Sequence, residues 1–280
     1  MRLKEALAEG AQVLALAGVP QSRKEGADLL AFVLKNSSPA SFFELDRVLT
    51  PREIAQWRAL ISRRAQREPF AYLTKHVDFL GCQLRVTADV LVPRQETEIL
   101  AEKIIHMLPP DKNKIAWDLC CGSGCLGIAI KKARPQLAMT LSDISEKALG
   151  LARQNALQNG VKVRSLLGDL LAPFKGEKAD YLFCNPPYLT EEEYEGVEPE
   201  VRFFEPRSAL VAGSSGVEFF VRLARSLPSF LAPSAQVFFE IGAGQGQALR
   251  EIFSGKHWKK GACLLDWAGK ERFFFLEFCP

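Results

Sequence analysis

Apolar and polar positions change their spacing about a quarter of the way along the 280-residue chain. Up to about residue 75, apolar residues recur at the three- and four-residue intervals of amphipathic helices. The first such stripe consists of Leu3, Leu7, Val13, Leu14 and Ala17. A second helix is predicted over GADLLAFVLK, residues 26–35. Residues 1–75 are therefore predicted to form a helical domain.

A third helix in this region is predicted from the sequence TPRE. Thr50 has the residue type of an N-cap, Pro51 suits the first helical position, and Glu53 completes a capping box. Its apolar stripe is formed by Ile54, Trp57, Leu60 and Ile61. Most of the nearby arginines lie off that stripe, and we interpret them as a solvated face rather than a nucleic-acid patch: Arg52, Arg58, Arg63, Arg64 and Arg67.

Strand-like runs then flank a glycine in VDFLGCQLRVTADVLVPR, and residues 76–93 are predicted to form a β-hairpin linker. From residue 115 onward, short apolar runs alternate with helical patterns. The predicted strands are IAWDLC, AMTLSD, KVRSLLGD, ADYLFCN, AQVFFEIG, ACLLDWAG and RFFFLEF. This alternation predicts an α/β, Rossmann-like domain over residues 94–280, with a parallel sheet covered on both faces. Ligands of such sheets bind beyond the carboxyl ends of the strands.

Composition changes this picture little. The charged fraction of 25% is ordinary for a globular protein, and a net charge of +3 gives no argument for a nucleic-acid partner. Seven cysteines, an odd number, lie in or beside apolar segments, which favours reduced thiols and a cytoplasmic protein. The sequence CCGSGC lacks partners at metal-ligand spacing, so no metal is expected. The first residues do not resemble a signal peptide, and we find no candidate membrane span.

The glycine-rich segment GSGCLG, residues 122–127, matches the dinucleotide fingerprint between a strand and a helix. Asp143 ends the next strand, where its carboxylate can accept hydrogen bonds from both ribose hydroxyls. Alone, this pattern indicates an adenosine-containing cofactor, either a nicotinamide dinucleotide or S-adenosylmethionine, or else only a tight strand–helix turn. Asp118, just before the loop, would face a methionine ammonium or orient the loop. Asp169, or Leu170 after it, would border the adenine.

The remaining strand ends disfavour a nicotinamide enzyme, which needs a proton donor near the substrate. The three histidines, His76, His106 and His257, do not lie at strand ends of the predicted sheet. The strand ADYLFC is instead followed by NPPY, residues 185–188.

NPPY suits a substrate with a planar amide or aromatic-amine nitrogen, whose delocalised lone pair makes it a poor nucleophile. Asn185 can offer its side-chain oxygen and Pro186 its backbone carbonyl to the two N–H groups. The two prolines hold these acceptors in an extended conformation. The ring of Tyr188 can cover a flat substrate group. Catalysis would then rest on orientation and electrostatic stabilisation.

Together these segments resemble the bacterial peptide chain release factor glutamine N5-methyltransferases of the PrmC/HemK type. The resemblance rests on six segments: REPFAYLTKHVDFLGCQLRVTADVLVPRQETE, DLCCGSGCLGIAI, SDISEKALGLARQNA, NPPY, FEPRSALVAGSSGVEFF and EIGAGQGQAL. It implies a helical partner-recognition domain, a hairpin and a methyltransferase domain with a mostly parallel seven-stranded sheet. It also implies methyl transfer from S-adenosylmethionine to the glutamine of the GGQ loop in class I release factors, which modulates translation termination.

The resemblance also implies roles for particular residues. Those expected to contact the cofactor are Cys120, Cys121, Gly122, Ser123, Gly124, Asp143, Asp169, Leu170 and Asn185. The glutamine would be bound by Asn185, Pro186, Pro187 and Tyr188. Closure over the site would involve Arg94, Glu96, Thr97 and Glu98. Two positions depart from the family pattern: Cys120 replaces the first loop glycine, which makes a positive φ there doubtful, and Leu170 replaces a common aromatic residue beside the adenine.

Three other functions remain open from the sequence: adenine-N6 methylation of DNA or RNA, methylation of a ribosomal-protein glutamine, and a binding module without activity. The segment after NPPY carries seven glutamates and one arginine, and we expect this acidic rim to line the substrate entrance and repel phosphates. The expected partners are class I release factors, without stable nucleic-acid or membrane association. The free protein is expected to be a monomer.

Overall fold

The computed structural model describes residues 1–34, 45–110, 113–259 and 261–280. Lys35, the last residue of the predicted second helix, lies outside these ranges. The chain divides into two compact units. The first contains Met1–Lys75 and Glu198–Phe204, and the second contains His76–Val197 and Glu205–Pro280. Sequence analysis had placed residues 198–204 in the methyltransferase domain.

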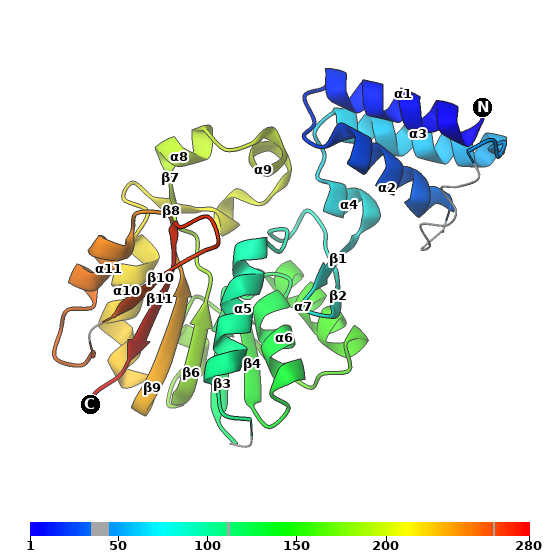
Figure 1. The fold of residues 1–280 in the computed structure, drawn as a ribbon. Coiled ribbons are helices and arrows are strands. Elements are labelled where there is room, and N and C mark those ends of the chain that lie inside the picture. The colour runs from blue at the N-terminus through cyan, green and yellow to red at the C-terminus, as the bar shows by residue number, and fades with distance from the viewer. Residues whose placement is uncertain (35–44, 111–112, 260) are drawn as a thin grey trace. The chain divides into compact units, whose positions relative to one another are not determined.

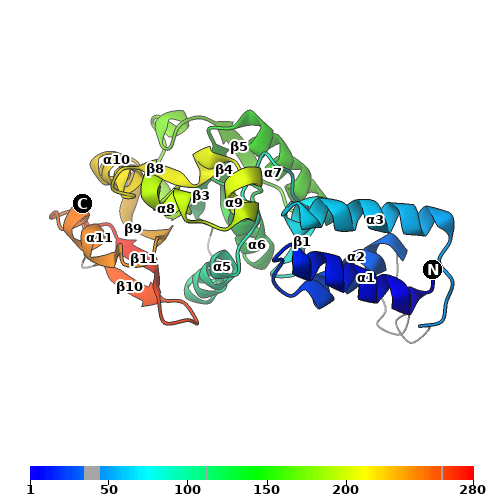
Figure 2. The same ribbon diagram turned by 90° about the horizontal axis from the view of Figure 1, so that it is seen from above.

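The first unit is helical, and its helices α1 to α4 are seen in Figure 1, with α1 to α3 seen again from above in Figure 2. They are α1 (Leu3–Leu16), α2 (Ser22–Leu34), α3 (Pro51–Ala65), α4 (Phe70–Thr74) and, from the later part of the chain, α9 (Pro199–Phe204). Leu14, Leu29 and Trp57 are fully buried in its core. The predicted capping box begins α3: the Glu53 amide donates to the Thr50 hydroxyl at 3.2 Å, and the Thr50 amide donates to the Glu53 carboxylate at 2.8 Å.

The predicted solvated face is confirmed for Arg52, Arg58 and Arg63, which are exposed, but it is wrong for Arg64. Arg64 is only 4% exposed. Its guanidinium donates to Glu25 at 2.5 Å and to Glu200 at 2.9 Å, and Arg67 donates to the same Glu200 at 2.6 Å. A buried cation of this kind requires charged partners. One of them lies 136 residues away in sequence, beyond the reach of a helical-periodicity argument.

The second unit begins with the predicted hairpin, formed by β1 (His76–Phe79) and β2 (Cys82–Arg85). The two strands are antiparallel, with Val77 opposite Leu84. The turn between them holds Leu80 and Gly81, both at positive φ.

A seven-stranded sheet forms the centre of this unit in the described residues, in the order β10-β11-β9-β6-β3-β4-β5. The strands are β3 (Ile115–Leu119), β4 (Ala138–Asp143), β5 (Arg164–Leu167), β6 (Ala179–Cys184), β9 (Leu231–Glu240), β10 (Ala262–Leu265) and β11 (Glu271–Glu277). β5, β4, β3, β6 and β9 run parallel, whereas β11 is antiparallel to β9 and β10. The mostly parallel α/β fold is confirmed.

Successive residues of a strand point to opposite faces of the sheet, so a strand with a continuous apolar run needs helices on both faces to bury it. On β9, Phe238 packs with one hydrophobic cluster, and Val237 and Phe239 pack with the other. The first cluster includes residues of α5 (Gln95–Met107), α6 (Cys125–Ala133) and α7 (Glu146–Gln158). The second includes residues of α10 (Glu218–Ser226) and α11 (Gly246–Ile252). Figure 1 shows the two groups of helices on either side of the strands.

Several elements were not predicted. The main one is α5, which begins within the segment PRQETE that the sequence interpretation treated only as a closing segment. The other short elements are η2 (Ala172–Phe174), β7 (Leu189–Thr190), α8 (Glu191–Glu195), η3 (Arg207–Ala209), β8 (Val211–Gly213) and η4 (Leu227–Ser229). Across the described ranges, the structure contains no helix that combines the length and apolar character needed to cross a bilayer.

Candidate active site

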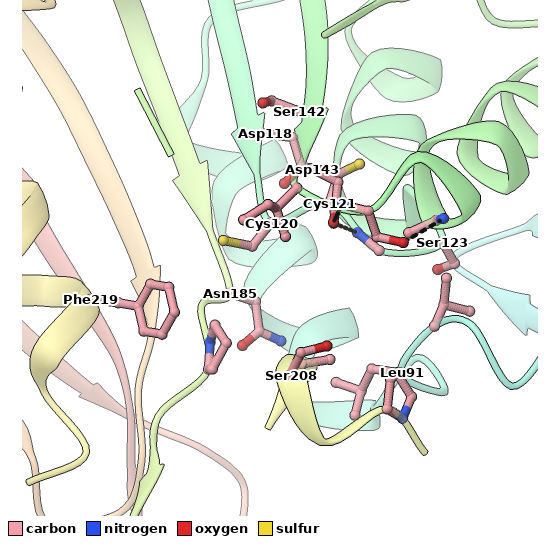
Figure 3. Close-up of a pocket in the computed structure, with 18 of the residues that line it drawn as sticks. Leu91, Asp118, Cys120, Cys121, Ser123, Ser142, Asp143, Asn185, Ser208 and Phe219 are labelled. Carbon is pink, nitrogen blue, oxygen red and sulfur yellow. Dashed lines mark hydrogen bonds between the residues drawn. The ribbon is translucent and has the colours of Figure 1, made fainter. Parts of the chain in front are cut away.

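A cavity of about 520 Å³ lies in the second unit beyond the carboxyl ends of its parallel strands. The loop after β3, the end of β4, the turn after β5 and the NPPY segment after β6 all contribute to its wall. Figure 3 shows Cys120, Asp143 and Asn185 arranged around it. This is the position at which open α/β sheets bind ligands, and the predicted strand-end residues meet there.

The glycine loop forms one side of the cavity. Gly124 adopts φ +80°, and a side-chain carbon at Gly127 would lie 2.4 Å from Leu141 and 2.8 Å from the Asp118 carboxylate. These two positions therefore require glycine, one for the turn and the other for close packing of α6 on the sheet. Cys120 adopts φ +55°, so the doubt about a positive φ at this position was wrong. We infer that the surrounding fold holds this strained conformation.

Asp143 lies at the end of β4 and binds one backbone amide of the glycine loop and one of the turn that follows its own strand. Its Oδ2 accepts from the Gly122 amide at 2.9 Å, and its Oδ1 accepts from the Ser145 amide at 2.9 Å. Burial raises the pKa of Asp143, while these amide hydrogen bonds act in the opposite direction. Each carboxylate oxygen keeps a second lone pair for another donor. These two acceptor oxygens fit the two hydroxyls of a ribose.

Asp118 is 2% exposed, and its Oδ2 accepts from the Gly127 amide at 2.9 Å. Burial raises the pKa of its carboxyl to about 7. Of the two roles considered from sequence, this contact supports the one in which Asp118 orients the loop and the start of α6. Asp118 also lines the cavity.

The turn after β5 supplies the wall expected to border an adenine. Leu170 adopts φ +49° and lines the cavity. Asp169 lines it as well, but its carboxylate is paired with Arg222 of α10. Phe219, from the same helix, contributes an aromatic ring that sequence analysis missed (Figure 3). An adenine ring could therefore find aromatic contact here despite the leucine at position 170.

The NPPY residues separate into two groups. Asn185 and Pro187 line the cavity, whereas Pro186 and Tyr188 are not among the described residues of its wall. Pro186 is buried, like Pro187, and burial is the main cause that raises the pKa of the Tyr188 phenol. The Tyr188 carbonyl accepts from the Gln245 side-chain amide at 2.9 Å. The motif thus presents its asparagine to the cavity and fixes its tyrosine backbone in the fold.

The residues of the PRQETE segment differ in whether they line the cavity. Thr97 of α5 lines the cavity, and its hydroxyl accepts from Asn185 Nδ2 at 3.3 Å. Arg94 donates to Glu205 at 2.5 Å, and Glu98 accepts from the Leu80 amide at 2.6 Å. Glu96 is not among the described residues of the cavity wall. Thr97 is therefore the member of the predicted closing set that directly contacts the NPPY motif.

Glu240 was not predicted, although a single carboxylate in the apolar run AQVFFEIG was a visible signal. It ends β9, is 1% exposed, and accepts from the Thr97 hydroxyl at 2.6 Å. Burial raises the pKa of Glu240 to about 7. A chain of hydrogen bonds thus runs from Asn185 through Thr97 to this buried acid.

The acidic segment after NPPY does not form the continuous rim expected from sequence. Glu205 is 5% exposed and accepts from Arg94 and, at 3.1 Å, from the Val92 amide. Glu200 belongs to the helical unit and is paired with Arg64 and Arg67. Arginine side chains therefore neutralise Glu200 and Glu205. The negative potential that a substrate would meet at this segment is weaker than its formal charge indicates.

Two protein-family models match this chain, one mainly in the helical unit and one mainly in the unit that contains the sheet. Residues 5–74 match the PrmC N-terminal domain, and residues 94–206 match the methyltransferase small domain. The chain also resembles the solved 16S rRNA methyltransferase RsmC of T. thermophilus in complex with AdoMet and guanosine. That likeness has a TM-score of 0.51 at 15% identity, covers 72% of this chain and 49% of the other, and shows the fold alone.

Full-length relatives are more similar. The release factor glutamine methyltransferase of Chlamydia trachomatis serovar D is 42% identical over 276 residues, covering 98% of this chain and 94% of the relative. That of Moorella thermoacetica is 34% identical, covering 98% of each chain. The chain therefore belongs to the release factor glutamine methyltransferase family.

Proposed function

We propose that this protein transfers a methyl group from S-adenosylmethionine to the side-chain amide nitrogen of the GGQ-loop glutamine in class I peptide release factors. The observation that carries the proposal is the meeting of Asn185 and Asp143 in one cavity. The family relation supplies the substrate, because the relatives named above are release factor glutamine methyltransferases. Glutamine methylation would modulate translation termination, and we propose a cytoplasmic location because release factors act in translation.

The cavity wall offers contacts for each part of the cofactor. We assign the Asp143 carboxylate to the ribose hydroxyls, and Leu170 with Phe219 to the adenine. The loop residues 120–124 would lie along the methionine portion. S-adenosylmethionine supplies an electrophilic sulfonium methyl, so this chemistry requires neither a covalent enzyme intermediate nor a metal.

For the glutamine, we assign the Asn185 side-chain oxygen and the Pro186 carbonyl as acceptors of the two amide N–H groups. With both hydrogens held, the nitrogen lone pair is directed towards the methyl carbon. Methyl transfer would form the N–C bond as the sulfonium S–C bond breaks, would leave S-adenosylhomocysteine, and would release one nitrogen proton to water. Fixed acceptors stabilise the positive charge that develops on the nitrogen in the transition state. Tyr188 would support the motif through its backbone carbonyl, which Gln245 holds, and the helical unit is the proposed recognition surface for the release factor.

The direct test is reaction of the purified protein with S-adenosylmethionine and a class I release factor. We expect the GGQ-loop peptide to gain one methyl group on its glutamine, measured by peptide mass spectrometry. A release factor with asparagine in place of that glutamine is the matched control and should remain unmodified. Absence of methylation on the unaltered release factor, or equal methylation of both, would refute the proposal.

A further inference from the structure

Three polar side chains from separate segments meet in the interior beside the cavity. Asn185 follows β6, Thr97 lies in the first turn of α5, and Glu240 ends β9. Asn185 Nδ2 lies 3.3 Å from the Thr97 hydroxyl oxygen, which lies 2.6 Å from Glu240 Oε2. Thr97 is 3% exposed and Glu240 is 1% exposed, so water has little access to either group.

The chemistry of these groups fixes the direction of their hydrogen bonds. An ionised carboxylate only accepts, so the single hydroxyl hydrogen of Thr97 is donated to Glu240. The Thr97 oxygen can then only accept, which requires Asn185 to present its NH₂ group. Asn185 also lowers the pKa of Glu240, as a donor close to the carboxylate does, which favours the same orientation. The Asn185 carbonyl oxygen is therefore the end left for the cavity, into which this side chain projects (Figure 3).

We propose that Thr97 and Glu240 are positioning residues that determine which end of the Asn185 carboxamide faces the substrate. The two ends of a carboxamide have nearly the same shape, and the position of Asn185 alone does not select between them. Only the oxygen can accept from a substrate N–H, because the NH₂ end would oppose another donor. The inference rests on the proposed role of Asn185 and adds the residues that make that role possible.

Protonation of Glu240 would remove this selection. A neutral carboxyl can donate to the Thr97 oxygen, which frees the hydroxyl to donate to a reversed Asn185. Glu96 of α5 raises the pKa of Glu240 and Arg272 of β11 lowers it, in addition to the dominant effect of burial. The charge of Glu240 in turn raises the pKa values of the nearby Tyr188 and Cys125 side chains. Because its pKa is near 7, the active orientation would be lost as the pH falls through that value.

Two conservative variants test the inference: Thr97→Val, which removes the hydroxyl, and Glu240→Gln, which removes the negative charge. Each should lower kcat about tenfold through the loss of one orienting hydrogen bond, while cofactor affinity stays unchanged. Thr97→Ser retains the hydroxyl and should keep kcat close to that of the unaltered protein. Thr140→Val makes the same change at a buried position of β4 outside this chain of hydrogen bonds and should also retain normal kcat.

The pH dependence of kcat separates positioning from a structural role. In the unaltered protein, kcat should fall below about pH 7, whereas Glu240→Gln should lose this acidic limb. If the unaltered enzyme is active and Thr97→Val and Glu240→Gln both have normal kcat, the positioning inference is wrong. The proposed function is unaffected by that result. An unaltered protein that does not methylate a release factor would instead refute the proposed function.

Discussion

At the level of single residues, Asp143 and Asn185 lie at two strand ends that meet in the cavity, and we propose different roles for them. Asp143 follows β4 and already accepts two backbone amide hydrogens. Asn185 follows β6 and is oriented by Thr97. Binding and catalysis should therefore respond separately to substitutions at these positions.

Asn185→Ala should lower kcat by about 10²–10³-fold, the usual effect of removing one preorganised polar contact from a catalytic site. Steady-state methylation of a release factor measures this loss. Cofactor affinity, followed by calorimetry, should change little because the loop and Asp143 are unaltered. Near-normal kcat would show that Asn185 does not hold the reacting amide.

Asp143→Asn should mainly raise the KM for S-adenosylmethionine, by about tenfold or more, because a charged acceptor of the ribose hydroxyls is lost. Its kcat at saturating cofactor should stay within about threefold, since those hydroxyls do not change charge during transfer. A collapse of kcat without a change in KM would contradict this placement of Asp143.

At the scale of helices and strands, much of the second unit could be predicted from sequence. The predicted helix CLGIAIKKA and strand AMTLSD coincide with α6 and β4, because glycine, proline and charged residues bound their apolar patterns. The start of α5 was not recognised, and neither were the partners of Thr97. Contacts between distant segments depend on the tertiary fold, and the local hydrophobic pattern of the sequence does not predict them.

Two glycines in neighbouring helices provide a matched test of this packing. Gly127→Ala should lower the free energy of unfolding by about 1–3 kcal/mol, because the added methyl would overlap Leu141 and Asp118. Gly150→Ala in α7 meets no atom within 4 Å and should raise it by about 0.5–1 kcal/mol. Chemical denaturation measures both values. Equal effects would contradict the close approach of α6 to the sheet.

At the scale of the whole molecule, the chain enters the helical unit twice, through residues 1–75 and again through residues 198–204. The second passage begins at residue 198, after the NPPY segment that ends at residue 188. It is held by ion pairs from Arg64 and Arg67 to Glu200. Burial alone would raise the pKa of Glu200, but hydrogen bonds from Arg67 and Arg64 leave it below the ordinary glutamate value.

Glu200→Gln should therefore destabilise the helical unit by about 1–3 kcal/mol, since Arg64 keeps only part of its charged environment. A lowered folded-state pKa means that the contribution is present above the ordinary value of 4.5 and is lost as the pH falls below it. Denaturation of the variant and the unaltered protein between neutral and acidic pH tests this. Glu192→Gln, at an exposed site in α8, is the control and should change stability by less than about 0.5 kcal/mol. If the free energies of unfolding of Glu200→Gln and of the unaltered protein differ by the same amount at every pH, the lowered pKa of Glu200 is contradicted.

The central claim is that this enzyme methylates a protein glutamine. Its most direct test is incubation of the purified protein with labelled S-adenosylmethionine and a cell extract, followed by identification of the labelled macromolecule. We expect label in class I release factors, on the glutamine nitrogen of the GGQ loop. Label confined to DNA or RNA adenine, or to a ribosomal protein, would contradict it.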